Sequence, residues 1–342
     1  MTKGSRGYYT AVLGVMILLL LFGAYFSLTQ GSMDMTVKEV ITTLLRLDVQ
    51  PDRDLVIFEF RLPRIVIAVL VGAGLGIAGA VLQGITRNGL ADPGILGINA
   101  GAGAAMVIFL FFYQGEIKGT GWGAIMAMPM FGLIGGLLSA ALIFVFAWKR
   151  GSLEPERLLL SGIAVASGLG ALTIYFTLKM DAKDFEMAAV WTAGSIYNAN
   201  WKYIVSMLPW LLILIPVIYS KSRLLDLLGL KDESTRSLGV AADKQRTLLL
   251  LCSVGIVSAC VSVSGGIGFI GLMSPHIASR LVGRRHSRLL PACGLIGGLL
   301  VMISDYIGRT LFSPVELPAG MVVAILGGPY FIYLMYRNRR QA

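Results

Sequence analysis

The residue patterns that enzymes use for catalysis are missing from this chain. No GxxxxGK[ST] phosphate-binding loop occurs, so the chain has no P-loop of its own with which to hydrolyse ATP. No GxSxG motif is present, and His276 and His286 have no carboxylate between them, which rules out an HExxH-type metal site. We therefore expect a protein that is not an enzyme, with no catalytic residues, no bound metal and no cofactor of its own.

Charged residues inside apolar segments are the next candidates for function, because a charge in a membrane is costly. Asp305 and Arg309 lie four residues apart in one such segment, a spacing at which they can meet on one helix face. They form either a self-satisfied pair or part of a functional site. Acidic residues are otherwise scarce in the apolar segments, and this scarcity argues against a carrier driven by protons or sodium.

A pair of arginines opens the second apolar segment, in the sequence Arg61-Leu62-Pro63-Arg64. Pro63 suits the first turn of a helix. Basic residues are disfavoured on the outer side of a membrane, where the topology below places this segment, so the pair needs an explanation. The two arginines could contact lipid headgroups, or they could receive acidic residues of an external protein.

Two segments rich in Gly and Pro interrupt the apolar sequence. The first, 87–94, reads RNGLADPG and predicts a tight turn. The second, 265–272, reads GGIGFIGL and leads into Pro275. At membrane depth such a sequence predicts irregular backbone, which is tolerated only where protein or a water-filled cavity surrounds it.

The composition is that of an integral membrane protein. The mean hydropathy is +0.77, and only 14% of the 342 residues are charged, against roughly 25% in soluble domains. A span needs about 20 apolar residues, and runs this long and continuous predict helices rather than a β-barrel. Ten spans are expected, at about 11–28, 63–86, 95–113, 124–147, 158–178, 203–220, 247–264, 266–283, 289–309 and 318–336. We expect the first to be retained, because no A-x-A cleavage site follows it.

Small residues recur at every fourth position in several spans, a spacing that lets helix backbones approach closely. We expect these stripes to build a tight helical bundle, and the alternative is that their backbone lines a permeation path. The stripes are Gly72, Gly76, Ala80 and Gly84; Gly97, Gly101 and Ala105; Gly132, Gly136 and Ala140; and Gly162, Ala166 and Gly170.

The basic residues indicate the orientation of the chain. With a cytoplasmic N-terminus, eighteen of the 29 Lys and Arg residues fall in inside segments, as the positive-inside rule requires. An even number of spans then places both termini in the cytoplasm. These loops account for the net charge of +10, and no basic face of a soluble fold suggests nucleic-acid binding.

The longest polar stretch of the second half is the run 221–246, in which ten residues are charged, and the orientation places it in the cytoplasm. A short helix could occupy 232–238, with Asp232 or Ser234 near its start and with Glu233 and Arg236 on a shared face. Gly239 could end it, with a second short helix running into the next span. Two short helices make a compact knob that another protein can bind, whereas the alternative is a solvated connection.

These motifs together resemble those of the FecCD-type permeases, the membrane subunits of binding-protein-dependent, ATP-driven importers of ferric siderophores, haem and cobalamin. One departure is Gly89, which stands where the family commonly has proline and makes the turn looser. The resemblance extends from about residue 61 to 333. It is carried by RLPR (61–64), QGITRNGLADPGILG (83–97), SLGV (237–240), GGIGFIGLMSPHIASRLVG (265–283), LLPACGLIGG (289–298), ELPAG (316–320) and LGGPYFIYL (326–334).

The resemblance implies a single all-α transmembrane domain over residues 1–342, with the type II importer fold of cobalamin permeases and a cytoplasmic coupling loop at 221–246. It also implies three sets of site residues. The residues implied for docking of the external binding protein are Arg61, Arg64 and Arg309. Those implied for the cytoplasmic gate are Asn88 and Leu90. Those implied for coupling to the ATPase are Asp232, Glu233, Arg236 and Gly239.

The same resemblance implies partners. They are a second permease subunit, identical or similar, two cytosolic ATPase subunits that bind the ATP, and an external substrate-binding protein. We expect the chain to move ferric siderophores across the cytoplasmic membrane by ATP-driven alternating access. Cobalamin and haem are the alternative substrates, and an ion-coupled secondary transporter is the alternative from another class.

Overall fold

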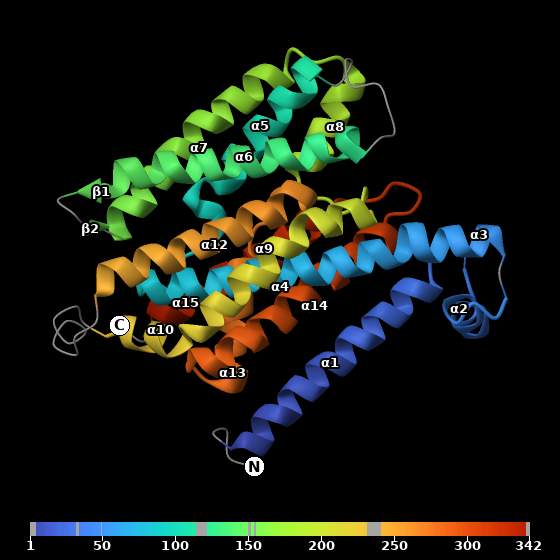
Figure 1. The fold of residues 1–342 in the computed structure, drawn as a ribbon, viewed down its shortest axis with the longest axis horizontal. Helices are drawn as coiled ribbons and strands as arrows, with labels where there is room; N and C mark the ends of the chain where they lie inside the picture. The colour runs from blue at the N-terminus through green and yellow to red at the C-terminus, as the bar shows by residue number, and fades with distance from the viewer. Residues whose placement is uncertain are drawn as a thin grey trace.

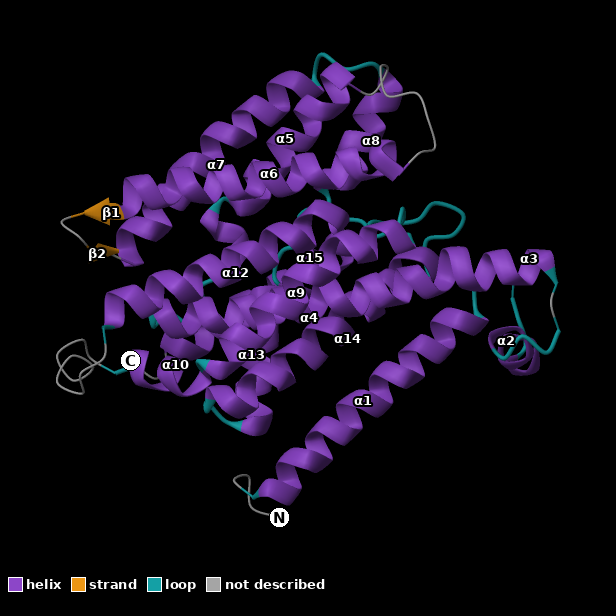
Figure 2. Ribbon diagram, viewed as in Figure 1, coloured by secondary structure: helices purple, strands orange, loops and turns teal. Residues whose placement is uncertain are grey.

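The computed structural model describes residues 5–31, 34–48, 50–113, 122–149, 152–153, 155–230 and 241–339. These residues are almost entirely helical (Figure 2). The strands among the described residues are limited to one antiparallel pair of two residues each, β1 (Trp148–Lys149) and β2 (Ser152–Leu153). The predicted all-α class is confirmed.

Each of the ten predicted spans coincides with a helix. Within the described ranges, eight helices are long and apolar enough to cross a membrane. They are α1 (Arg6–Thr29), α4 (Leu62–Thr86), α6 (Trp122–Ala147), α7 (Pro155–Thr177), α9 (Trp201–Ser220), α12 (Ala242–Ser264), α14 (His286–Thr310) and α15 (Ala319–Arg339). The other two, α5 (Ile98–Tyr113) and α13 (Ile270–Val282), have 16 and 13 residues. They rise about 24 and 20 Å, which is less than a hydrocarbon core of about 30 Å.

The remaining elements are short. They are α2 (Val37–Leu44), α3 (Pro51–Asp54), a π-helical turn (Leu55–Arg61), a 3-10 turn (Pro93–Leu96), α8 (Ala182–Thr192) and α10 (Ser222–Leu228). The chain from α3 through the π-helical turn to α4 is continuously helical. Pro63 has no N–H to donate, and just before it the N–H of Leu62 bonds to the carbonyl of Ile57, five residues back. The wider turn therefore carries the helix past the proline.

The helices form two groups that meet along α12. In Figure 1, α5, α6, α7 and α8 lie together at the top, and the other long helices lie below them, with α1 along the lower side. Helix α4 is central, because it packs against α12, α13 and α14. We name the two ends of the bundle after the residues at the ends of α4, as the Arg64 end and the Arg87 end.

The two ends of the described chain lie at the same end of the bundle. Helix α1 begins at the Arg87 end, where Arg288 lies 5.5 Å from the ring centre of Tyr9, and it finishes beside Arg61. Helix α15 begins at the Arg64 end, where the N–H of Gly320 donates to Gly194, and runs back. This agrees with an even number of crossings.

Glycines let the central helices touch along their backbones. A Cβ on Gly72 would lie 2.2 Å from the carbonyl oxygen of Gly297 in α14, and one on Gly79 would lie 2.0 Å from that of Gly271 in α13. Gly101 of α5 approaches Gly135 of α6 in the same way. The close approach predicted from the small-residue stripes is confirmed at Gly72 and Gly101, whereas Gly79 lies outside the stripes and a Cβ on Gly170 would have no neighbour within 4 Å among the described atoms.

The first prediction concerns the contact of α4 with α14. We expect Gly72→Ala to destabilise the fold by about 1–3 kcal/mol, because the added methyl group overlaps the backbone of Gly297. The measurement is the thermal midpoint of the protein purified in detergent. Gly14→Ala in α1 is the matched control, because its Cβ would meet nothing within 4 Å. An equal midpoint for the two variants would contradict the contact.

Candidate functional site

The two breaker-rich segments meet inside the bundle, although 170 residues separate them in the sequence. Pro93 of the first segment packs on Gly271 of the second, where a Cβ would lie 2.6 Å from the proline Cδ. Asp92 is buried, and its Oδ1 accepts the N–H of Gly94 at 2.7 Å. The short helices α5 and α13 begin at this junction, which explains why neither has the length of a full span.

Gln83 of α4 joins the two segments. Its Nε2 lies within 3.3–3.4 Å of three carbonyl oxygens, those of Ala91, Gly271 and Leu272. Gln83 lies one helical turn from Gly79 and four residues before Arg87, and its side chain is partly buried. The irregular backbone predicted here is present, and a side chain of a continuous helix satisfies part of it.

Strained backbone marks the second segment. Phe269 immediately precedes α13 and has φ +65°, in the left-handed region that side chains rarely adopt. Its ring lies in space left by Gly327 of α15, where a Cβ would be 2.7 Å from the ring carbon Cγ. Pro275 lies inside α13, so the irregular part is confined to 265–269. Such strain persists only where the surroundings hold it, and it is frequent at functional sites.

The two gate residues predicted from the sequence lie in the turn at the Arg87 end. The Oδ1 of Asn88 accepts the N–H of Leu90 at 3.0 Å, and the carbonyl of Asn88 accepts the N–H of Ala91 at 3.0 Å. Asn88 is exposed and Leu90 is half-buried. The turn is thus stabilised by its own side chain, with Gly89 in an unstrained conformation.

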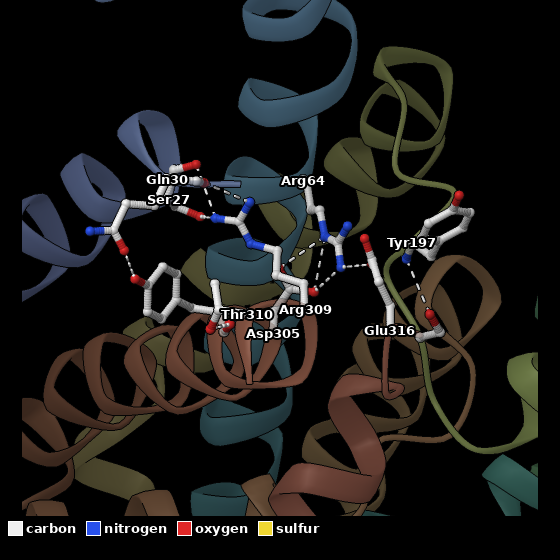
Figure 3. Close-up of polar contacts among 10 residues, drawn as sticks. Ser27, Gln30, Arg64, Tyr197, Asp305, Arg309, Thr310 and Glu316 are labelled. Carbon is white, nitrogen blue, oxygen red and sulfur yellow. Dashed lines mark hydrogen bonds and ion pairs between the residues drawn. The ribbon is translucent and has the colours of Figure 1, made fainter. Parts of the chain in front are cut away.

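Arg64 forms the main charged contact at the opposite end (Figure 3). Its Nε and Nη2 donate to the carboxylate of Asp305 at 2.8–3.0 Å, and Nη2 also donates to Glu316 at 2.8 Å. The side chain of Asp305 is 6% exposed, whereas that of Glu316 is 35% exposed. Asp305 is therefore an internal partner, and Glu316 is the carboxylate that solvent can reach.

Arg61 and Arg309 bind the end of α1. Arg309 donates through Nη2 to the carbonyl and hydroxyl oxygens of Ser27 at 3.0 and 2.8 Å, and through Nη1 to the carbonyl of Gln30 at 3.2 Å. Arg61 donates to the carbonyl of Leu28. The last carbonyls of a helix have no partner within it, so these two arginines cap α1.

The possible pairing of Asp305 with Arg309 is not observed. Both lie in α14, but Asp305 bonds to Arg64 of α4, and Arg309 turns to the end of α1. Asp305 gains more from the two-pronged contact with the guanidinium of Arg64 than from a single contact along its own helix. Arg309 is drawn to α1 because the last carbonyls of that helix need hydrogen-bond donors.

A polar groove of about 870 Å³ opens beside these charges at the Arg64 end. Asp34, Arg309 and Glu316 are among the residues that line it, and it lies between the end of α1, the start of α2 and the loop after α14. Of the three predicted docking arginines, Arg309 lines this groove, Arg64 donates to Glu316, which also lines it, and Arg61 donates to Leu28 at the end of α1. Each of them thus has a partner within the chain.

The predicted ATPase-coupling residues Asp232, Glu233, Arg236 and Gly239 lie outside the described residues. The described parts of the run 221–246 are helical, with α10 before the gap and the start of α12 after it.

Sequence reasoning missed two residues that the structure places in these sites. Gln83 and Glu316 both begin motifs that drew attention as whole strings, QGITRNGLADPGILG and ELPAG. The signal for Gln83 was a polar side chain one helical turn before a predicted break. The signal for Glu316 was an acidic residue that could pair with the unexplained arginines Arg61 and Arg64.

The second prediction tests the burial of Asp305. We expect Asp305→Ala to destabilise the fold by about 3 kcal/mol, because it leaves the guanidinium of Arg64 without its buried partner. Glu316→Ala, at the exposed side of the same guanidinium, should cost about 1 kcal/mol or less. The thermal midpoints of the two purified variants in detergent measure the difference. Equal losses would show that the two carboxylates have the same role.

Comparisons with known proteins agree with this architecture. A sequence profile described as the FecCD transport family matches residues 18–337. The chain is 52% identical over 324 residues to the iron-uptake system permease protein FeuC of Bacillus subtilis, covering 95% of this chain and 96% of that protein. It is 43% identical over 326 residues to the iron(3+)-hydroxamate import system permease protein FhuG of the same organism, covering 95% and 96%.

More distant relatives match over similar lengths. The hemin transport system permease protein HmuU of Yersinia pestis is 34% identical and covers 96% of each chain. A solved structure of an inward-facing metal-chelate type ABC transporter superposes with a TM-score of 0.82 at 31% identity, covering 96% of this chain and 99% of that one. With a family match over nearly its whole length and a 52% identical relative, this chain belongs to the FecCD transport family.

Proposed function

We propose that this chain is the membrane-spanning permease subunit of a binding-protein-dependent ABC importer that carries ferric siderophores across the cytoplasmic membrane. The observation that carries the proposal is the full-length similarity to permeases for iron and iron(3+)-hydroxamate. The absence of a P-loop from the sequence supports a subunit that leaves ATP hydrolysis to a partner. The chain itself would bind no cofactor.

Orientation and partners follow from the charge distribution and the family. The Arg87 end, which carries most of the basic loops, would face the cytoplasm together with both termini. Two ATPase subunits would bind there through the segment 231–240. The Arg64 end would face outward and receive the binding protein, and a second permease subunit, identical or similar, would complete the translocation path.

The junction of the two breaker-rich segments is the proposed moving part. Asn88 and Leu90 would close the cytoplasmic end of the path, because they lie in the turn that runs into the interrupted helix α5. Short hydrogen-bonded turns can rearrange without breaking a helix, whereas the continuous spans cannot. ATP-driven closure of the ATPase subunits would shift this turn and open the path inward.

Haem is the second candidate substrate, because HmuU of Yersinia pestis is similar over nearly the full length. Cobalamin is the third, on the family resemblance alone. An ion-coupled carrier is the least supported function, because acidic residues are scarce in the spans.

The third prediction tests the energy source and the substrate together. In cells whose only importer contains this chain, we expect uptake of labelled ferric siderophore to stop when the P-loop lysine of the partner ATPase is replaced. An ionophore should leave uptake intact while ATP remains. Uptake that continues without a working ATPase would refute the proposal. If haem or cobalamin, and not other siderophores, competed with the labelled substrate, the substrate would be assigned to that class instead.

The fourth prediction concerns docking at the Arg64 end. An external carboxylate would compete with Glu316 for the exposed side of Arg64, since Asp305 fills the buried side. We therefore expect Glu316→Gln to tighten capture of the binding protein by about threefold to tenfold, with a stronger dependence on salt. Surface plasmon resonance with the permease in nanodiscs measures this. Glu59→Gln at the same end is the control, and weaker capture by Glu316→Gln would contradict the idea.

A further inference from the structure

Helix α10 lies between the segment proposed to bind the ATPase and the turn proposed as the gate. It has only seven residues, Ser222–Leu228, and a helix of this length is not stable by itself. Leu225 and Leu228 are fully buried, and they anchor it at the Arg87 end of the bundle. The segment 231–240 follows it almost directly. The position of α10 is therefore set by its contacts with the neighbouring helices.

The first contact of α10 is with the beginning of α14. One oxygen of Asp226, Oδ1, accepts the backbone N–H of His286 at 2.9 Å and lies 2.6 Å from the Nδ1 of the same residue. His286 is the first residue of α14, and the N-cap residue, Arg285, contributes no side-chain cap. A carboxylate from α10 thus takes the role of the missing cap, and its negative charge is favourable at a helix N-terminus.

The ring of His286 is held from its other side by α4. A Cβ on Gly84 would lie 2.9 Å from the Nε2 of His286 and 3.6 Å from Leu225. The imidazole therefore fits between α10 and α4 because residue 84 has no side chain. The side chain of His286 is 12% exposed and that of Asp226 is 33% exposed, so the contact lies at the edge of the bundle.

The second contact of α10 is with the gate turn. The Nε of Arg87 donates to the carbonyl of Leu228, the last residue of α10, at 3.0 Å. Arg87 ends α4 in the left-handed conformation, with φ +52°, and Asn88 is the next residue. A cation at a helix C-terminus is favourable, so Arg87 caps α10 while it sets the start of the turn.

We infer that α10 is the structural link between the ATPase-binding segment and the gate turn, and that Arg87, Asp226 and His286 are positioning residues that hold it. This inference rests on the proposed function. A displacement of the segment after α10 cannot be absorbed by a short helix that is capped at one end and bonded to α14. It is transmitted to the residue that precedes Asn88 and to the first turn of α14.

The test uses the complete importer, reconstituted in proteoliposomes with its ATPase subunits and binding protein. Uptake of ferric siderophore and hydrolysis of ATP are measured on the same vesicles. For Asp226→Ala we expect about tenfold less substrate moved per ATP, with hydrolysis within about twofold of the unmodified importer. Asp226→Asn keeps an acceptor oxygen for the N–H of His286, and it should restore most of the ratio. Arg223→Ala, at an exposed position of the same helix, is the matched control.

Arg87→Met removes the second contact independently and should lower the same ratio. A normal ratio in both Asp226→Ala and Arg87→Met would overturn the inference. Parallel loss of uptake and hydrolysis, release of the ATPase subunits, or misfolding of both variants would also overturn it, because the contacts would then serve assembly alone. If the proposed function itself were wrong, the unmodified importer would show no ATP-dependent siderophore uptake, and this result distinguishes the two failures.

Discussion

A backbone N–H or C=O group in hydrocarbon has no water to bond, and each unpaired group is costly. This constraint applies beside α4, where the chain leaves helical geometry twice. A carbonyl of the first break, that of Ala91, and two carbonyls from the first turn of α13 lie within reach of one amide, that of Gln83. Two breaks in separate parts of a bundle would need two sets of partners. Placed side by side against one continuous helix, they share them, and the Gly and Pro residues that make the breaks also let them fit.

The same requirement explains how the helix ends are completed. The last carbonyls of α1 accept hydrogen bonds from Arg61 and Arg309, and the last carbonyl of α10 accepts one from Arg87. The first N–H of α14 bonds to Asp226. In each case the capping side chain comes from a different helix, so that satisfying a helix end also fixes the position of a neighbour. Charged residues at the two ends of this bundle are therefore part of its architecture.

Most of the architecture could be predicted from the sequence, because apolar length and small-residue spacing are local properties. The ten helices and the backbone contacts at Gly72 and Gly76 are examples. Irregular backbone within 265–272 was predicted from its glycines, but the residue at which α13 begins could not be predicted, because it depends on how this segment packs against the first break. Arg64 was identified as an unusual residue, but its partners, Asp305 and Glu316, are more than 240 positions away. Such pairings depend on how helices are arranged, which a pattern along the chain does not specify.

The backbone contact between α4 and α14 has a consequence for motion. Side chains between two helices can change rotamer and let the helices slide, but Gly72 and Gly297 leave no layer of side chains there. A shift along the axis would drive main-chain atoms of one helix into those of the other. The pair is thus expected to move as one rigid body, and any rearrangement during transport falls to interfaces that do contain side chains, such as those between this pair and the group of α5, α6 and α7.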